Sequence, residues 1–217
     1  MKYNNKPITK VLVLCEESGK VRRAFKNQGA NYVWSCDLLP SQDNDPYHLK
    51  KDVFECLNYF ETNDVKLDLI IAFPPCQFMA SSGNRWHAKS KERQDAIKWT
   101  LRLWDRCKAL ADFVAFENPV GALSTALAKH DPHMFKTYIQ PWQHGHGETK
   151  KTGLFLSRLP NLLPSSIVEG RENRIWKMPP SPTRTQQRSE TYTGIARAMA
   201  SQWLPYVKAM QSIGVFK

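Results

Sequence analysis

The stretch Val11-Leu12-Val13-Leu14-Cys15-Glu16-Glu17-Ser18-Gly19-Lys20-Val21 contains a short apolar run, a polar turn and the start of an amphipathic segment. The apolar run has the length and the branched side chains of a buried β-strand. After the turn, Val21, Ala24 and Phe25 recur at helical spacing until Gly29 ends the pattern. The stretch therefore predicts a strand, a turn and a helix in succession, the unit from which parallel sheets are built.

The same alternation of strand and helix continues towards the C-terminus. The pattern predicts strands over residues 11–15, 31–36, 67–73 and 113–116, a polar loop over 38–51, helices over 52–60 and 92–110, and, beyond 138, a strand over 153–156 and a closing helix over 194–210. We therefore expect an α/β fold with a doubly wound, mostly parallel sheet. Ligands of such sheets bind at the carboxyl ends of the strands.

Length and composition indicate one globular domain over residues 1–217. The longest apolar runs are far shorter than the ~18 residues that a membrane span needs, so we expect a cytoplasmic protein, and a monomer. The five cysteines are odd in number, about 20 or more residues apart and never in a CxxC pair, so a disulfide framework and a clustered zinc site are both unexpected. We expect reduced thiols and no bound metal.

Positive charge is concentrated in the C-terminal part. The chain has 31 Lys and Arg against 20 Asp and Glu, a formal net charge of +11. Residues 1–128 contain 18 basic and 15 acidic side chains, net +3, whereas residues 129–217 contain 13 and 5, net +8. Basic side chains near Trp176, Tyr192 and Trp203 suit a polyanion such as nucleic acid, and a solvated, solubilising surface is the alternative.

Cys76 follows a predicted strand on the turn Pro74-Pro75-Cys76-Gln77. The prolines fix the backbone there and place the sulfur at the mouth of the sheet, where a nucleophile must lie. An inert, half-buried thiol is the commoner state of a lone cysteine. The prediction of a nucleophile gains weight because Glu117-Asn118-Pro119 ends another predicted strand in the same way.

These two turns resemble the catalytic motifs of the DNA cytosine C5-methyltransferases, whose usual forms are Pro-Cys-Gln and Glu-Asn-Val. The matching residues here are Phe73-Pro74-Pro75-Cys76-Gln77 with Ser82-Gly83, and Phe116-Glu117-Asn118-Pro119. The resemblance implies that Cys76 is the nucleophile and that Glu117 and Asn118 complete the catalytic pair. It also implies a Rossmann-like, S-adenosylmethionine-dependent methyltransferase, similar to the short phage-encoded members of the family.

The resemblance extends to the cofactor site. The segment from Leu14 to Arg22 occupies the place of the family's Gly-rich loop, and Asp37 occupies the place of the acidic residue after the second strand. Asp52 occupies the place of the aspartate in the family's Gly-Asp motif. Thr193-Gly194-Ile195-Ala196 resembles the family's last motif. The implied cofactor is S-adenosylmethionine, and its predicted contacts are Glu16, Ser18, Gly19, Asp37, Asp52 and Pro74. For the two aspartates, a surface position or a helix cap is the alternative. Residues 1–128 then form the cofactor and catalytic core.

The sequence departs from the family pattern in three places. The loop has one glycine instead of several, Pro119 replaces Val, and Lys150-Lys151-Thr152 stands where the family has Gln-x-Arg-x-Arg. We expect Lys151 to supply the catalytic positive charge. Fewer than forty residues separate Ser157 from the closing helix, too few for a separate recognition domain, so we expect little or short sequence specificity.

Residues 129–217, which are basic and rich in proline, form the predicted nucleic-acid-facing part with the closing helix. The predicted DNA contacts are Gln77, Arg85, Lys150, Arg171, Arg174, Arg184 and Arg188. The expected reaction is methylation of cytosine C5 in DNA, and protection of phage DNA from restriction in the host cytoplasm is the expected role. The same reaction on a free nucleotide or on RNA stays open, as does a catalytically weak DNA-binding protein of this fold.

Two further patterns are weaker. His146-Gly147-Glu148 and Pro75-Cys76 are fragments of a zinc deaminase signature, but their order is reversed and Met79 stands where a second Cys belongs. Residues 145–152 nearly form a phosphate-binding P-loop, yet Lys150 replaces its second Gly. We expect a polar loop that approaches the nucleic acid.

Overall fold

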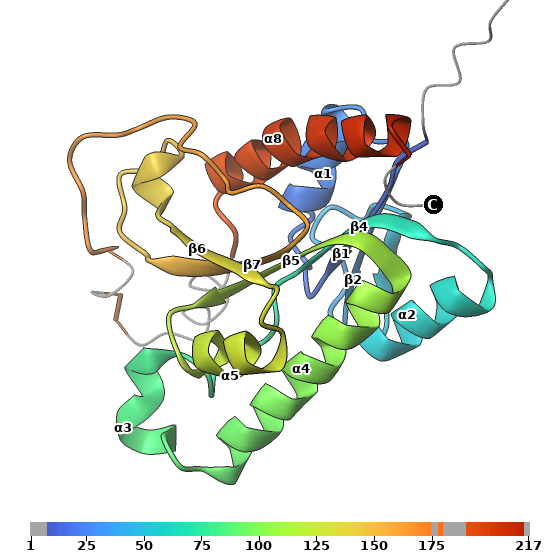
Figure 1. Ribbon diagram of the computed structural model, residues 1–217. Coiled ribbons are helices and arrows are strands. Elements are labelled where there is room, and N and C mark those ends of the chain that lie inside the picture. Colours follow the sequence, from blue (N-terminus) through green and yellow to red (C-terminus); the bar gives the residue numbers. More distant parts are fainter. Residues whose placement is uncertain (1–7, 175–177, 180–189, 215–217) are drawn as a thin grey trace, which may run out of the picture.

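The computed structural model describes residues 8–174, 178–179 and 190–214, and its centre is a seven-stranded sheet (Figure 1). The strand order is β3-β2-β1-β4-β5-β7-β6. The strands are β1 (Lys10–Leu14), β2 (Tyr32–Asp37), β3 (His48–Lys50), β4 (Leu67–Ala72), β5 (Ala111–Pro119), β6 (Phe135–Ile139) and β7 (Thr152–Ser157). Strands β1 to β5 pair in parallel, whereas β7 is antiparallel to both β5 and β6. The chain winds outward from β1 in both directions, as the sequence predicts.

Helices cover both faces of the sheet (Figure 1). One face packs on α1 (Lys20–Asn27) and α8 (Thr193–Ser212), and the other packs on α2 (Val53–Thr62), α4 (Lys91–Leu110) and α5 (Ala122–His130). Side chains alternate along each strand, so in β1 Val11 and Val13 face α1 while Leu12 and Leu14 face α2 and α4. Burial on both faces explains why the central strands are continuous apolar runs.

The structure differs from the sequence prediction in four elements. The predicted loop over residues 38–51 contains the short edge strand β3. Strand β5 does not end at Phe116 but runs through Glu117 and Asn118 to Pro119, because the antiparallel partner β7 supplies backbone pairing to that end. Helix α5 and strand β6 lie in a segment for which no element was predicted.

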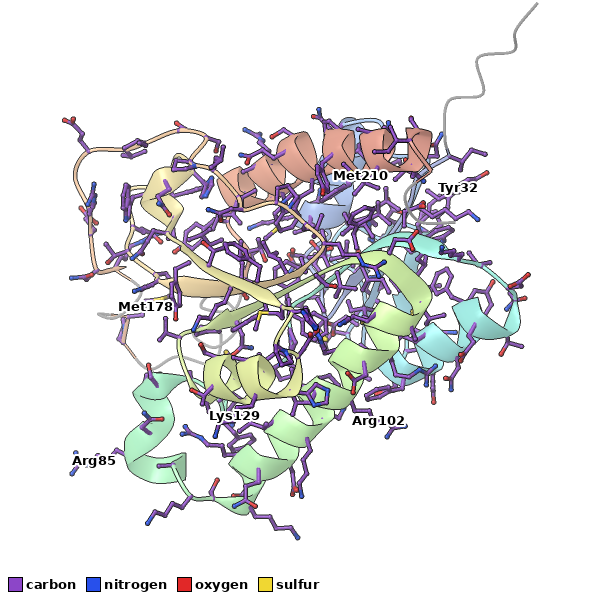
Figure 2. All side chains as sticks on the ribbon, viewed as in Figure 1. Tyr32, Arg85, Arg102, Lys129, Met178 and Met210 are labelled. Carbon is purple, nitrogen blue, oxygen red and sulfur yellow. The ribbon has the colours of Figure 1, made fainter. Side chains whose placement is uncertain are left out.

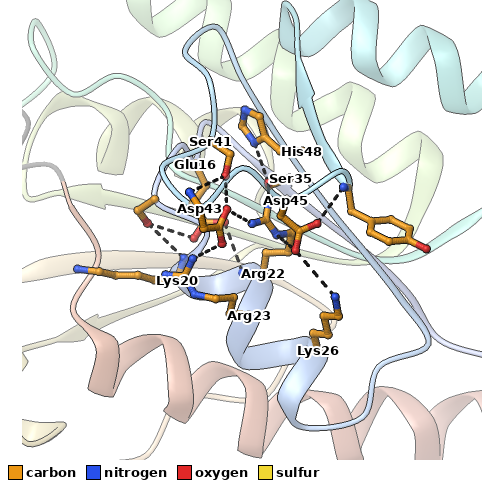
Figure 3. Close-up of polar contacts among 12 residues, drawn as sticks. Glu16, Lys20, Arg22, Arg23, Lys26, Ser35, Ser41, Asp43, Asp45 and His48 are labelled. Atoms are coloured by element: carbon orange, nitrogen blue, oxygen red, sulfur yellow. Dashed lines mark hydrogen bonds and ion pairs between the residues drawn. The ribbon is translucent and has the colours of Figure 1, made fainter.

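The loop after β2 is held against α1 by a buried arginine (Figure 3). Arg22 has no exposed surface; it donates hydrogen bonds to Ser35 Oγ at 2.6 Å and to Asp43 Oδ1 at 2.5 Å. Asp43 also pairs with Arg23, and these contacts hold the pKa of the Asp43 carboxyl well below its usual range despite partial burial. The network fixes the loop that follows Asp37, a predicted cofactor residue.

The remaining described helices are short: η1 (Ser81–Gly83), α3 (Asn84–His87) and η2 (Pro141–Gln143). None of the described helices combines the length and the apolar character that crossing a bilayer requires.

Candidate active site

A cavity of about 900 Å³ lies at the carboxyl ends of the parallel strands. Its walls come from the ends of β1, β2, β4 and β5 and from three places in the C-terminal part. The lining residues are Cys15, Glu16, Glu17, Ser18, Asp37, Leu39, Phe73, Pro75, Cys76, Gln77, Ala80, Ser81, Ser82, Pro119, Val120, Gln140, Thr149, Lys150, Lys151, Glu190 and Thr191. Strands β1 and β4 are adjacent, and the winding direction reverses between them. Ligand sites of doubly wound sheets form at this reversal point.

The Glu16 carboxylate lies at the N-terminal end of α1 and accepts hydrogen bonds from its first turn. The donors are Val21 N at 2.6 Å and Arg22 N at 3.4 Å, and only 4% of Glu16 is exposed. Burial raises the pKa of Glu16 to about 7, although these hydrogen bonds act in the opposite direction. Glu16 and Ser18 line the cavity, and Gly19 begins the helix with φ at 65°. A side chain on Gly19 would lie within 2.7 Å of Arg22 and Asp43, so the turn requires glycine.

The two predicted cofactor aspartates have different positions. Asp37, at the end of β2, lines the cavity and accepts a hydrogen bond from Leu39 N at 2.9 Å. Burial raises the pKa of the Asp37 carboxyl. Asp52 caps α2 by accepting from Phe54 N at 2.8 Å, and it is not among the residues that line the cavity.

Cys76 lies in a turn that two backbone hydrogen bonds close, from Met79 N and Ala80 N to its own carbonyl oxygen, each at 3.0 Å. The residue is half-buried and faces the cavity. None of the five cysteines forms a disulfide bond. Pro74 does not line the cavity; its carbonyl oxygen accepts a hydrogen bond from Asn118 Nδ2 at 2.9 Å.

This hydrogen bond joins the two predicted catalytic motifs. Asn118 has no exposed surface, and within the described part of the chain its Oδ1 atom has no hydrogen-bond partner. The neighbouring residue Glu117 lines a small separate pocket, here called the side pocket, which shares Lys150, Glu190 and Thr191 with the cavity. Ile139, Pro141, Thr152 and Tyr192 also line this side pocket. Burial raises the pKa of the Glu117 carboxyl, while the Lys150 charge and the Thr152 hydroxyl act against the rise.

The two lysines that precede β7 lie in different surroundings. Lys150 lines both the cavity and the side pocket, and its ammonium nitrogen lies 6.0 Å from the centre of the Tyr192 ring. Lys151 lines only the main cavity, with its ammonium nitrogen 4.4 Å above the Tyr138 ring of β6. The structure therefore places Lys150 next to Glu117, whereas the sequence comparison had assigned the catalytic charge to Lys151. Alternation along an extended chain gives the reason, because Lys150 and Thr152 share a face and Lys151 points to the other.

Only some of the residues predicted to contact DNA line the cavity. Gln77, Lys150 and Lys151 line the cavity. Arg85 lies on α3 and points away from the sheet (Figure 2). Arg174 forms an ion pair with Glu148, and Arg171 stacks on Trp142 with its guanidinium carbon 3.6 Å from the ring centre. Arg184 and Arg188 lie outside the described residues.

Sequence reasoning missed the residues that fix the last segment of the chain against the cavity. Tyr192 donates a hydrogen bond to Glu148, and Gly194 N donates one to His146 Nε2 at 2.9 Å. A Cβ on Gly194 would lie 1.7 Å from the His144 carbonyl oxygen, so α8 begins in direct contact with this loop. His146 and Glu148 thus hold the chain in place, and among the described residues no group of three His, Cys, Asp or Glu could hold a metal ion. The only signal for this role in the sequence was the His-x-Glu spacing.

No protein-family model matches the chain, and no curated protein matches it in sequence. Solved structures match it in fold. A protein described as a DNA modification methyltransferase encoded within a prophage (E. coli) aligns with a TM-score of 0.52 and 17% identity over 79% of this chain and 55% of that one. The S. pombe Dnmt2 methyltransferase aligns with a TM-score of 0.50 and 17% identity over 79% of this chain and 54% of that one. The Entamoeba histolytica methyltransferase EhMeth aligns with a TM-score of 0.52 and 13% identity over 77% of this chain and 57% of that one.

The chain spans about half the length of these proteins. At these identities the likeness concerns the arrangement of helices and strands. The mixed sheet, the two helical layers and these structural neighbours together establish a Rossmann-like, methyltransferase-type α/β fold.

Proposed function

We propose that this chain transfers a methyl group from S-adenosylmethionine to C5 of cytosine in DNA. One observation carries the proposal: the Asn118–Pro74 hydrogen bond joins the turn that carries Cys76 to the end of β5 that carries Glu117, next to a cavity that Cys76, Asp37 and the β1–α1 turn line. The structural neighbour described as a DNA modification methyltransferase supports methyl transfer to DNA. The basic C-terminal part supports a polyanionic substrate.

The residues at the cavity fit the cofactor. Its volume of about 900 Å³ lies within the usual range for ligand pockets. Asp37 offers a carboxylate that would accept hydrogen bonds from ribose hydroxyls, and Glu16, Ser18 and Gly19 form the adjoining turn. Bound S-adenosylmethionine would supply the methyl group as an electrophile on its sulfonium. Asp52 caps α2 and is not among the residues that line the cavity, so we assign it no cofactor contact.

Cys76 would act as the nucleophile. Cytosine C5 is a poor nucleophile until a group adds to C6, and a thiolate that adds there turns C5 into an enamine carbon. The Cys76 sulfur is suited to this step because its turn is closed by two backbone hydrogen bonds at the rim of the cavity. C5 then takes the methyl group from the sulfonium, and loss of the C5 proton with expulsion of the thiolate restores the aromatic ring and the enzyme.

Glu117 would stabilise the ring during the addition. Electron density moves to N3 when the thiolate adds to C6, and a protonated carboxyl that donates a hydrogen bond to N3 favours this change. Burial, which raises the pKa of Glu117, favours the protonated form. We assign the nearby positive charge to Lys150, because it is the lysine that faces Glu117, and Lys151 to the DNA-facing rim.

The substrate is a base within a DNA strand, which must leave the stack to reach Cys76 at a cost of a few kcal/mol. Phosphate contacts from the basic residues 129–217 would offset this cost. We further propose that residues 1–217 act as a monomeric catalytic domain in the cytoplasm. Its proposed role is to protect DNA against restriction.

Parallel transfer of a labelled methyl group tests the proposal. Purified protein is incubated with labelled S-adenosylmethionine and, separately, with duplex DNA, RNA and dCMP. We expect label in DNA, in 5-methylcytosine. Label only in RNA or dCMP would move the reaction to the alternative substrate, and no label in any of the three would indicate a binding protein of this fold.

A further inference from the structure

Two segments beside the cavity form a continuous, hydrogen-bonded structure, which we name the paired loops: residues 142–149 and 165–174. They run alongside each other with bridges at His144–Ser166 and Glu148–Glu172. Backbone hydrogen bonds of 2.7–3.0 Å join the two segments along their length. They run from Ser165 N to Gln143 O, Gly145 N to Ser166 O, Val168 N to Trp142 O, Glu172 N to Gly147 O and Thr149 N to Glu172 O. The paired loops therefore have a fixed backbone although they contain no long strand or helix.

The paired loops border the cavity directly. Thr149 lines the cavity, and its amide bonds to the carbonyl oxygen of Glu172. Arg171 is the residue before Glu172, and it follows Gly170, which turns the chain with φ at 80°. Arg171 is thus attached to the cavity wall through its neighbour.

Arg171 is held in a defined orientation. Its guanidinium carbon lies 3.6 Å from the centre of the Trp142 ring, and the Trp142 carbonyl is itself bonded to Val168 across the paired loops. Arg171 is exposed to solvent. A guanidinium group stacked on an aromatic face keeps its N–H donors at the edge of its plane, where they can form two parallel hydrogen bonds.

Arg174 differs from Arg171 although it belongs to the same loop. It pairs with Glu148, a carboxylate that is 90% buried and that also accepts a hydrogen bond from Tyr192. Its charge is therefore offset within the protein. This contrast makes Arg171 the arginine of the paired loops that is best placed to contact a partner.

We propose that Arg171, held on Trp142, reads a guanine that flanks the target cytosine in DNA; this inference rests on the proposed function. Guanine presents O6 and N7 together at its edge, and a fixed guanidinium matches this pair of acceptors with two donors. Lys151, at the DNA-facing rim, contacts a phosphate, which adds affinity but no sequence information. One arginine reads one base, so the preference is for a single flanking guanine and not for a longer motif.

A randomised DNA library tests the assignment. Duplexes with random bases on both sides of a central cytosine are methylated by the full chain, and bisulfite sequencing gives the methylated fraction for each flanking base. We expect the wild type to prefer guanine at one flanking position by at least about fivefold, the lower end for a bidentate contact. Arg171→Lys keeps the charge but loses the planar pair of donors, so the preference should fall below about twofold while methylation continues.

Arg102→Lys is the matched control. Arg102 also stacks on an aromatic ring, with its guanidinium carbon 4.5 Å from the centre of the Phe54 ring, but it lies on α4, away from the paired loops (Figure 2). This variant should keep the wild-type preference. An equal loss of preference in Arg102→Lys would overturn the assignment, because the effect would not depend on the paired loops.

Three other outcomes are decisive. The same preference in wild type and Arg171→Lys, or no guanine preference in the wild type, would overturn the inference and leave the proposed function intact. No methylated cytosine with the wild type would overturn the proposed function and the inference with it.

Discussion

Asn118 Nδ2 donates a 2.9 Å hydrogen bond to the carbonyl oxygen of Pro74, which connects the middle of the sheet to the turn that carries Cys76. The bond is fully buried, and proline has no N–H of its own that could hold this turn in another way. The position of the Cys76 turn relative to the end of β5 therefore depends on Asn118.

Replacing Asn118 should impair both stability and catalysis. Asn118→Ala leaves a buried carbonyl without its donor, at a cost of about 1–3 kcal/mol in the free energy of unfolding. Urea unfolding gives this cost. Methyl transfer by the folded variant should lose turnover more than affinity for the cofactor, because the Cys76 turn is displaced. Unchanged turnover would show that the turn is fixed by other contacts.

Glu16 should make stability depend on pH near neutrality. Its pKa is raised to about 7 in the folded chain, whereas an unfolded glutamate has about 4.3. Between these values the folded state keeps a proton that the unfolded state has released, so the free energy of unfolding falls as pH rises from about 4 to 7. Glu16→Gln should remove this part of the dependence. Urea unfolding at pH 5 and pH 8 gives the free energy of unfolding of the wild type and of Glu16→Gln. If the two proteins differ in this free energy by the same amount at both pH values, the pKa of Glu16 is not raised.

The two lysines before β7 should differ in their effect on Glu117. The Lys150 charge lowers the pKa of this carboxyl, so Lys150→Met should raise it further. Lys151→Met should leave it unchanged, because Lys151 lies over Tyr138. A ¹³C NMR titration of the Glu117 carboxyl in each variant gives the answer. A larger change in the pKa of Glu117 with Lys151→Met than with Lys150→Met would show that Lys151 supplies the catalytic charge.

Asp37 should contribute to cofactor affinity. Asp37→Ala removes the acceptor assigned to the ribose and should weaken S-adenosylmethionine binding about tenfold, the scale of one hydrogen bond to a charged group. Calorimetry on the folded variant measures the dissociation constant. Asp52→Ala is the comparison: it removes the α2 cap, at a cost of about 1 kcal/mol in the free energy of unfolding, but it removes no residue that lines the cavity. An unchanged dissociation constant for Asp37→Ala would place the ribose elsewhere.

The sequence predicted the central part of the fold well. Strands β1, β2 and β4 and helices α1, α4 and α8 lie within a few residues of their predicted positions, because each has a strong apolar period. Strand β6 and helix α5 were missed. Phe135 and Tyr138 of β6 are exposed, so this edge strand lacks the apolar pattern of a buried one, and it is stabilised by pairing with β7.

The site was predicted to the level of elements but not of side-chain direction. Glu16, Asp37 and Cys76 follow strands that are adjacent in the sheet, so their meeting at one cavity could be foreseen. Which of Lys150 and Lys151 lies next to Glu117 could not be foreseen, because it depends on which face of the extended chain points inward. A shift of one residue reverses that assignment. The paired loops could not be foreseen either, since they are held by backbone bonds between segments about 20 residues apart.

Trapping on 5-fluorocytosine tests the central claim, that Cys76 is the nucleophile. Fluorine at C5 cannot leave as a proton does, so the covalent bond between the sulfur and C6 persists after methyl transfer. Duplex DNA containing 5-fluorocytosine is incubated with S-adenosylmethionine and the protein, and adducts are counted after denaturation. We expect a stable adduct with the wild type and with Cys15→Ser, a change at another cysteine of the cavity lining, and none with Cys76→Ala. An adduct with Cys76→Ala would contradict the account.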